Sequence, residues 1–116
     1  MSAVSFDFDG VISQLAWQMI AVSYQESGDD VYILTARCEA QGDRVKTVAD
    51  KLDIPRANVI FTCNRDKWEA VDQYEIDLHF DNNQEQVDKI NELSNGQAIN
   101  IDKIEPVDVM REHPTE

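Results

Sequence analysis

An α/β fold, in which a five-stranded parallel sheet lies between two layers of helices, is predicted by three features of this 116-residue sequence. Short apolar runs rich in β-branched and aromatic residues alternate with longer segments whose apolar residues recur every three or four positions. Five such runs and four such segments follow one another, with no internal repeat between them. Strands that alternate with helices form parallel sheets covered on both faces. The length is that of one domain.

The predicted strands are apolar runs bounded by polar or turn-forming residues. In chain order they cover residues 3–8, 31–35, 58–62, 76–81 and 98–101. In the fourth, Ile76, Leu78 and Phe80 alternate with polar residues, which is the period of a strand with two unlike faces. We expect the first strand to lie at the centre of the sheet.

The predicted helices lie between these strands. Residues 14–27 form the first, with Leu15, Met19 and Val22 at helical spacing and Gly28 as its end. The other three are marked by apolar residues at the same spacing: Val45, Val48, Ala49 and Leu52; Trp68, Val71 and Tyr74; Val87, Ile90 and Leu93. Residues 1–102 are therefore assigned to one folded core, and the polar residues 103–116 to a C-terminal tail.

The acidity of the chain limits its partners. Ten Lys and Arg against 23 Asp and Glu give a net charge of −13. Such a surface repels nucleic-acid backbones and anionic membranes, so we expect neither a long nucleic acid nor a membrane as a partner. No apolar run approaches the about 20 residues that a membrane-spanning helix needs, and no signal peptide is evident. These features together predict a cytoplasmic protein.

Two cysteines, Cys38 and Cys63, each follow a predicted strand, so we expect them near the same end of the sheet. Two residues at this spacing form neither a metal motif nor a disulfide framework. They are therefore predicted to be free thiols.

Acidic and polar residues stand where several predicted strands end. Asp7 and Asp9 come at the end of the first strand, Thr35 ends the second, and Asp81 ends the fourth. Lys67 opens the helix that follows the third strand. In open parallel sheets, ligands bind beyond the carboxyl ends of the strands. We therefore expect these side chains to gather at one edge of the sheet.

The pair Asp7 and Asp9 is unusual for a buried strand. The two carboxylates alternate with Phe6 and Phe8, so both lie on one side of the strand. Ionised carboxylates in such a place are costly unless they are paired or bind a metal. Gly10 then allows the chain to turn away. The alternative is that either aspartate only caps the next helix, and Asp-x-Asp-Gly alone is a moderately specific pattern.

The specificity comes from four segments in order, which are residues 7–10 (Asp-Phe-Asp-Gly), 35–37 (Thr-Ala-Arg), 66–67 (Asp-Lys) and 76–83 (ending Asp-Asn-Asn). Together they resemble the four motifs of the haloacid dehalogenase (HAD) superfamily, and the resemblance covers residues 3 to about 101. It implies a Rossmannoid core and a phosphatase that hydrolyses phosphate monoesters with Mg²⁺ through an aspartyl-phosphate.

The resemblance also implies roles for the catalytic and substrate-binding residues. Asp7 would attack phosphorus, and Asp9 would protonate the leaving group and then activate water. Thr35 and Lys67 would bind the phosphoryl group, with Lys67 also holding Asp7. Arg37 would join them in binding substrate at the rim.

The implied metal contacts are the side chains of Asp7 and Asp81 and the backbone carbonyl of Asp9, with Asn82 close by. Three carboxylates near a phosphate repel one another, and each ionised pair at about 5 Å costs roughly 3 kcal/mol at a dielectric near 20. A hard cation such as Mg²⁺ neutralises such a site.

Two departures from the family pattern stand out. Asn82 stands where a second aspartate is frequent, which puts the strength of metal binding in doubt. Only 25 residues separate Asp9 from Thr35 and 31 separate Thr35 from Lys67, so neither interval has room for a cap domain. An open site suits a protruding substrate such as a nucleic-acid end, or a neighbouring subunit that supplies the lid. We expect a small phosphorylated metabolite or a nucleotide as substrate.

Each assignment has a structural alternative without a catalytic role. Thr35 could be an ordinary strand residue, Lys67 a solvated helix residue, and Asp81 a helix cap, whereas His79 is expected to be structural. Two other functions compete with the phosphatase. One is a phosphoacceptor signalling domain of the receiver type, in which the acceptor aspartate follows the third strand and the lysine comes last. The other is a HAD-like domain that has lost catalysis and serves as a binding module.

Overall fold

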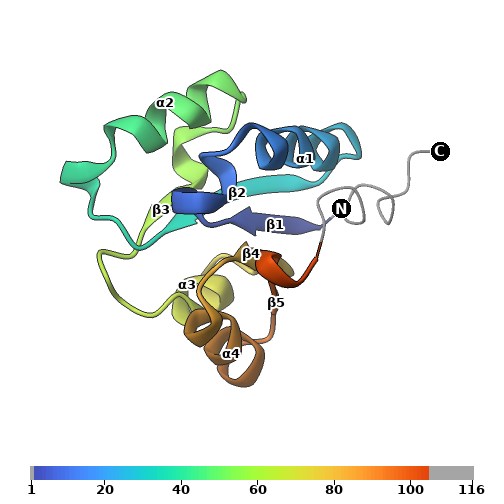
Figure 1. Cartoon of the computed structure of the whole chain (residues 1–116), viewed down its shortest axis with the longest axis vertical. Coiled ribbons are helices and arrows are strands. Elements are labelled where there is room, and N and C mark those ends of the chain that lie inside the picture. Colours follow the sequence, from blue (N-terminus) through green and yellow to red (C-terminus); the bar gives the residue numbers. More distant parts are fainter. Residues whose placement is uncertain (1, 105–116) are drawn as a thin grey trace.

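The computed structural model describes residues 2–104, and its centre is a five-stranded sheet in which every strand pair is parallel. The strands run β1 (Ala3–Phe6), β2 (Asp30–Thr35), β3 (Val59–Phe61), β4 (Leu78–Asp81) and β5 (Gln97–Asn100). Their spatial order is β3-β2-β1-β4-β5 (Figure 1). The predicted fold class is therefore confirmed, and β1 is the central strand.

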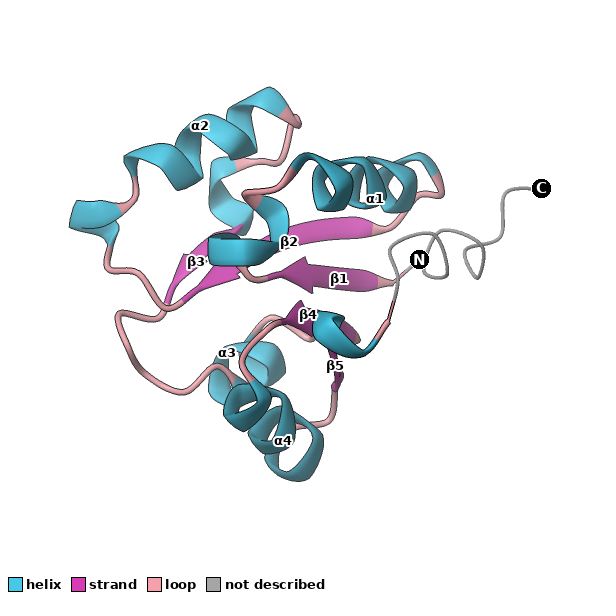
Figure 2. Cartoon of the chain, in the orientation of Figure 1, coloured by secondary structure: helices cyan, strands magenta, loops and turns pink. Residues whose placement is uncertain are grey.

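Helices cover both faces of this sheet. On one face lie α1 (Leu15–Glu26) and α2 (Asp43–Lys51), and on the other lie α3 (Trp68–Gln73) and α4 (Gln84–Leu93) (Figure 2). Each helix connects one strand to the next parallel strand, as this layered architecture requires. Within residues 2–104 no further folded unit is inserted between these elements, in agreement with the predicted absence of a cap.

The two faces of β1 differ in chemistry. Phe6 packs toward α1, where its ring lies 5.2 Å from Phe80 and 6.4 Å from Trp17 between ring centroids. Ser5 and Asp7 alternate with Phe6, so they face the α3 and α4 layer. The apolar side of the strand thus anchors the sheet, while the polar side leads to its carboxyl edge.

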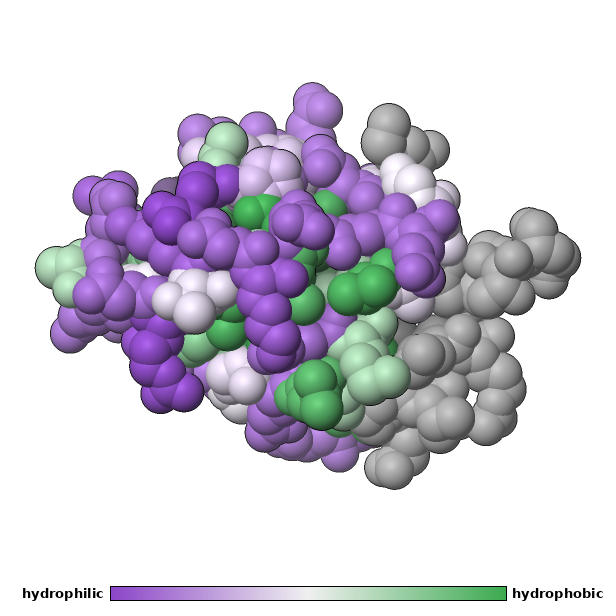
Figure 3. All heavy atoms as spheres, turned by 90° about the horizontal axis from the view of Figure 1, so that it is seen from above, coloured by the Kyte–Doolittle hydropathy of each residue, from purple (hydrophilic) through white to green (hydrophobic). Residues whose placement is uncertain are grey.

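The buried face of α1 is not the face that the apolar spacing predicts. Leu15 and Met19 are 66% and 56% exposed, whereas Trp17, Ile20 and Ala21 are buried. The bulky Trp17 ring fits against Phe6 and Phe80, and burying an indole removes more apolar surface from water than burying Leu or Met. Figure 3, which looks onto the α1 and α2 layer, shows hydrophobic residues exposed within a mainly hydrophilic face.

The element boundaries differ slightly from the prediction. The first strand ends at Phe6 rather than at residue 8, because a tight turn, Phe8–Ile12, follows it. The fourth begins at Leu78 rather than at residue 76. Of the predicted tail at 103–116, residues 105–116 lie outside the described part of the chain. No helix formed by residues 2–104 is both long and apolar enough to cross a membrane.

Candidate active site

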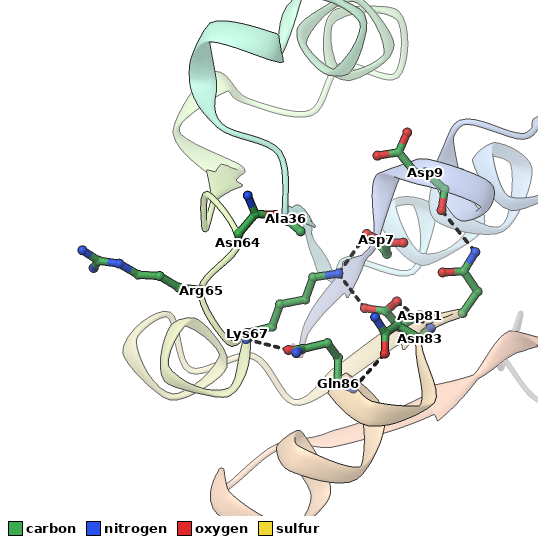
Figure 4. A pocket seen from close by; sticks show the side chains of 10 residues that line it. Asp7, Asp9, Ala36, Asn64, Arg65, Lys67, Asp81, Asn83 and Gln86 are labelled. Atoms are coloured by element: carbon green, nitrogen blue, oxygen red, sulfur yellow. Dashed lines mark hydrogen bonds and ion pairs between the residues drawn. The ribbon is translucent and has the colours of Figure 1, made fainter.

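A cavity of about 410 Å³ opens at the carboxyl edge of the sheet (Figure 4). Its lining includes Asp7 and Asp9 from the segment after β1, Lys67 from the segment before α3, and Asp81 and Asn82 from the end of β4. Segments far apart in the sequence therefore meet here. The expected convergence of Asp7, Lys67 and Asp81 at one edge is confirmed.

The ammonium of Lys67 joins the two buried carboxylates. Its Nζ donates to Oδ1 of Asp7 at 2.8 Å and to Oδ2 of Asp81 at 2.6 Å. The three side chains are 4%, 9% and 1% exposed, so this is a buried ion triad rather than a surface pair. Because Lys67 is buried between two acids, its interpretation as a solvated helix residue is wrong.

The backbone of Lys67 is also held in place. Its N–H donates to Oε1 of Gln86 on α4 at 2.9 Å, and Gln86 itself donates to Asp66. Asn83 caps α4 by accepting from the Gln86 N–H, while its own N–H donates to Oδ1 of Asp81. Asp81 is thus not the helix cap, and its carboxylate is fixed from both oxygens.

The turn after β1 brings the backbone of Asp9 to Asn82. Gly10 has a φ of 78°, and a Cβ there would stand 2.5 Å from Nδ2 of Asn82. The positive φ therefore favours glycine here, and a Cβ would also displace the Asn82 amide. With Gly10 in place, Nδ2 of Asn82 donates to the Asp9 carbonyl at 3.3 Å. The turn thus presents the Asp9 carbonyl, which the sequence assigns to the metal, on the side of the cavity that holds Asn82.

The carboxylate of Asp9 is held by Arg37 instead of facing Asp7. Nη2 and Nε of Arg37 donate to its two oxygens at 2.8 and 3.0 Å. Figure 4 shows the Asp9 carboxylate pointing away from the centre of the cavity. Hydrogen bonding to the Arg37 guanidinium lowers the pKa of Asp9 below its ordinary value. In this arrangement Asp9 is ionised, and Arg37 does not line the cavity.

Thr35 is not brought into the cavity either. Its side chain is completely buried at the end of β2, and Oγ1 accepts a hydrogen bond from the Arg37 N–H at 3.2 Å. Its neighbour Ala36 lines the cavity in its place. The role of Thr35 in binding a phosphoryl group stays a prediction.

The two buried aspartates have opposite pKa shifts. Burial, together with the charge of Asp81, raises the pKa of Asp7 to about 6 in spite of Lys67. Burial acts in the same direction on Asp81, but hydrogen bonding from His79 and the charge of Lys67 outweigh it, so the pKa of Asp81 falls well below its ordinary value. Asp81 is therefore a permanent anion, whereas Asp7 exchanges its proton in a mildly acidic range.

This difference predicts a pH dependence of stability in metal-free protein. The folded-state pKa of Asp7 exceeds its ordinary 3.8, so the protonated carboxyl favours folding. That contribution is complete below pH 3.8 and is lost as the pH rises through about 6. Between about pH 4 and pH 7.5, wild type should lose about 2 kcal/mol of unfolding free energy relative to Asp7→Asn. Urea unfolding of both proteins in EDTA measures this, and a pH-independent difference would contradict it.

The oxygen atoms at the cavity are of the type that binds a hard divalent cation. They comprise the carboxylates of Asp7 and Asp81, the backbone carbonyl of Asp9 and the side-chain amide of Asn82, and Mg²⁺ prefers such oxygen ligands. In the described residues no group of three or more His, Cys, Asp or Glu side chains is placed to hold a metal. The donor set therefore fits Mg²⁺ only if a backbone carbonyl and water complete it.

The prediction of free thiols is wrong, because Cys38 and Cys63 form a disulfide. Cys38 follows β2 and Cys63 follows β3, and these neighbouring parallel strands end at the same edge, as expected from the sequence. Two backbone hydrogen bonds, from Cys63 to Arg37 and from Asn64 to Ala36, bring the two segments together. Disulfides are rare in the reducing cytosol, so this bond does not favour a cytoplasmic location, which stays a prediction.

Sequence reasoning missed the roles of two polar residues, Gln86 in the cavity lining and His79 behind it. Gln86 positions Lys67, and His79 contacts Asp81 through Nε2 at 2.7 Å. The signal for His79 was its position two residues before Asp81, which places both side chains on one face of β4. Gln86 had no comparable signal, because its role depends on where α4 packs.

Comparison with known proteins adds no family assignment. No protein-family model matches the sequence, and no curated protein matches it significantly. The fold and the buried triad of Asp7, Lys67 and Asp81 therefore define the class only as a Rossmann-like α/β domain with an acidic, lysine-bridged cavity.

Proposed function

We propose that this protein is a Mg²⁺-dependent phosphomonoester hydrolase of the HAD type, with Asp7 as its nucleophile. One observation carries the proposal, which is that Lys67 Nζ contacts Asp7 and Asp81 at the carboxyl edge of a parallel sheet. These residues come from three of the four segments that resemble the HAD motifs. A buried lysine between two acids supplies the positive charge that a phosphate ester would meet beside a carboxylate nucleophile.

The proposed reaction has two displacements at phosphorus. A carboxylate oxygen of Asp7 attacks, the ester P–O bond breaks, and the departing alkoxide takes a proton from Asp9. Water then attacks the aspartyl-phosphate and gives a proton to Asp9, which releases inorganic phosphate and restores Asp7. Lys67 holds the attacking oxygen of Asp7 and balances the charge that collects around it.

The ion pair with Arg37 must open in the first displacement, because Asp9 has to carry a proton. Arg37 is 25% exposed and bonds Asp9 through two nitrogens, both of which also suit a phosphate oxygen. A bound phosphate ester would compete for this guanidinium and so release Asp9. Arg37 would then serve both as a substrate contact and as a holder of Asp9 in the free protein.

The proposed Mg²⁺ would be held by the side chains of Asp7 and Asp81 and by the Asp9 carbonyl, with Asn82 as an outer contact. When bound, it would neutralise phosphate charge next to the carboxylates. Lys67 alone leaves the triad with a net negative charge once Asp7 and Asp81 are both ionised, which is unfavourable for binding a phosphate dianion.

The proposed substrate is a small phosphorylated metabolite, a nucleotide or a nucleic-acid end. Arg65 stands at the rim of the cavity in a chain of net charge −13. With Mg²⁺ bound, the cation and Lys67 would offset the two carboxylates, so the cavity would suit one phosphorylated group, whereas the overall charge disfavours a long polynucleotide. We also propose that a second copy of the chain can cover the open cavity in a homo-oligomer.

The test is hydrolysis of p-nitrophenyl phosphate by the purified protein. We expect turnover with Mg²⁺ that stops when EDTA removes the metal and returns when Mg²⁺ is added in excess. A screen of phosphorylated metabolites, nucleotides and short phosphorylated oligonucleotides would then identify the preferred substrate. Hydrolysis that persists in EDTA would contradict the proposed metal dependence.

A binding module without catalysis is the second candidate. Two observations favour it: Asn82 replaces an expected acid, and Asp9 is engaged by Arg37. It would bind a phosphorylated ligand without turnover of any ester, which the same screen distinguishes. The receiver-type alternative is disfavoured by topology, because receivers have the strand order 2-1-3-4-5, whereas this sheet has the order 3-2-1-4-5.

A further inference from the structure

A line of buried polar side chains continues from the cavity into the sheet. The hydroxyl of Ser5 on β1 lies 2.6 Å from Nδ1 of His79 on β4, and Nε2 of His79 lies 2.7 Å from Oδ2 of Asp81. The same oxygen of Asp81 accepts from Lys67. Ser5, His79 and Asp81 have no exposed surface. Hydrogen bonds thus connect the interior of the sheet to the candidate metal ligand.

Ser5 and His79 occupy places where apolar residues would be expected. They are paired positions on adjacent parallel strands, and their side chains face a layer packed by residues such as Val71 and Ile90. Burying a hydroxyl and an imidazole costs free energy, which hydrogen bonds only offset. Two aliphatic side chains would fill this space without that cost. Packing alone therefore does not explain the pair.

The hydrogen positions follow from the chemistry of the partners. An ionised carboxylate only accepts, so Nε2 of His79 must carry a hydrogen and donate it to Asp81. In the neutral ring with this hydrogen, Nδ1 has none, and the Ser5 hydroxyl 2.6 Å away donates to it. Ser5 thereby satisfies the ring nitrogen that faces away from Asp81, in the tautomer that the Asp81 carboxylate requires.

A Ser-His-Asp combination also occurs in hydrolases that use serine as a nucleophile. Ser5 cannot act in that way here, because its side chain is completely buried and its hydroxyl is bonded to the imidazole. The cavity is lined by Asp7 and Asp81 and not by Ser5 or His79. The three residues therefore act on the cavity only through the carboxylate of Asp81.

We propose that His79, with its other ring nitrogen bonded to Ser5, is a positioning residue that fixes the orientation of the Asp81 carboxylate for binding a divalent cation. The inference rests on the proposed function for the cation itself. Oδ2 of Asp81 accepts from His79 and Lys67, and Oδ1 accepts from the Asn83 N–H at 3.0 Å. Three donors define the carboxylate plane and leave one lone pair, on Oδ1, for a metal. Outer partners of this kind typically change metal affinity by about 10- to 100-fold.

The test measures Mg²⁺ affinity of the full chain by titration calorimetry. His79→Leu, which fills similar space without a donor, should weaken Mg²⁺ binding by about 10-fold or more. His79→Gln keeps an amide N–H that can reach Asp81 and should retain most of the affinity. Gln18→Leu is the matched control, because Gln18 is buried and hydrogen-bonded to Ile12 and Lys51 away from the cavity. Its Mg²⁺ affinity should equal that of wild type.

Two further measurements separate positioning from folding. The double variant Ser5→Ala/His79→Leu removes both partners of the Ser5–His79 hydrogen bond, so its unfolding free energy should be no lower than that of His79→Leu, while Mg²⁺ binding stays weak. Nitrogen-15 NMR of the imidazole rings should show hydrogen on Nε2 of His79. The sequence contains only one other histidine, His113, so His113→Gln assigns the signals.

These measurements distinguish failure of the positioning role of His79 from failure of the proposed phosphatase function. If His79→Leu binds Mg²⁺ as tightly as wild type, or if Nε2 of His79 carries no hydrogen, the positioning role is overturned and the proposed phosphatase stands. If wild type itself does not bind Mg²⁺, the proposed function and this inference fall together. Weak Mg²⁺ binding by His79→Leu and by Ser5→Ala/His79→Leu, with normal Mg²⁺ binding by Gln18→Leu, supports the positioning role.

Discussion

Replacing the proposed nucleophile by its amide, Asp7→Asn, should lower the rate of p-nitrophenyl phosphate hydrolysis by at least about 10³-fold. An amide oxygen can still accept a hydrogen bond from Lys67, but it cannot form the acyl phosphate. The fold should persist, since β1 is anchored by the apolar contacts of Phe6 and the new side chain has almost the same shape. Steady-state rates and circular dichroism of the variant measure both effects.

Asp77→Asn is the matched control for this substitution. Asp77 precedes β4, is exposed, and accepts a hydrogen bond from the Ala3 N–H at the opposite end of the strands. Its amide variant should keep wild-type turnover. Acid-quenched wild-type protein should carry phosphate during turnover, and the Asp7→Asn protein should not. Undiminished turnover in Asp7→Asn would rule out the nucleophile assignment.

Removing the cation of the buried triad should have the largest effect on stability. Lys67→Met leaves Asp7 and Asp81 facing each other without a counter-charge, and breaking a buried pair in this way costs about 3–5 kcal/mol. The loss should be greatest above the pKa of Asp7, about 6, where both acids are ionised. Thermal unfolding in EDTA at a pH below and a pH above this value would measure it.

The same variant tests for the divalent cation independently of turnover. If Mg²⁺ binds between the acids, it should return part of the lost stability to Lys67→Met at neutral pH, because it replaces the missing positive charge. Lys46→Met, which removes a more exposed cation paired with Glu39, should change stability little with or without Mg²⁺. Equal stability of Lys67→Met and wild type above pH 6 would show that the triad carries no such charge balance.

The sheet and the acidic edge could be predicted from sequence because each depends on local chemistry. The β-branched run of β2 is typical of a buried strand. The carboxyl ends of parallel strands lie at the same edge of the sheet whatever their side chains. Asp7, Lys67 and Asp81 could therefore be placed together without coordinates. The packed face of α1 could not, because two apolar stripes compete there and the shape of the Trp17 pocket decides between them.

The orientation of individual side chains was also beyond the sequence. The pairing of Asp9 with Arg37 depends on the path of the turn after β1, in which Gly10 has a positive φ and Asn82 donates to the Asp9 carbonyl. His79 was expected to be structural because a lone histidine in a strand is more often structural than catalytic. Its position two residues before Asp81 places both on one face of β4, but only the register of β1 against β4 shows that it also faces Ser5.

The disulfide between Cys38 and Cys63 makes the loops after β2 and β3, which carry Arg37 and Arg65, sensitive to reducing agents. It closes a segment of 25 residues in sequence separation, and a cross-link over a loop of that size stabilises a fold by about 3 kcal/mol. Arg37 precedes one sulfur and Arg65 lies two residues after the other, so after reduction only backbone hydrogen bonds would join the two segments that carry these guanidinium groups. Protein kept in a thiol reductant and protein kept in air therefore differ in covalent structure at this edge, and a test of the proposed phosphatase should compare the two.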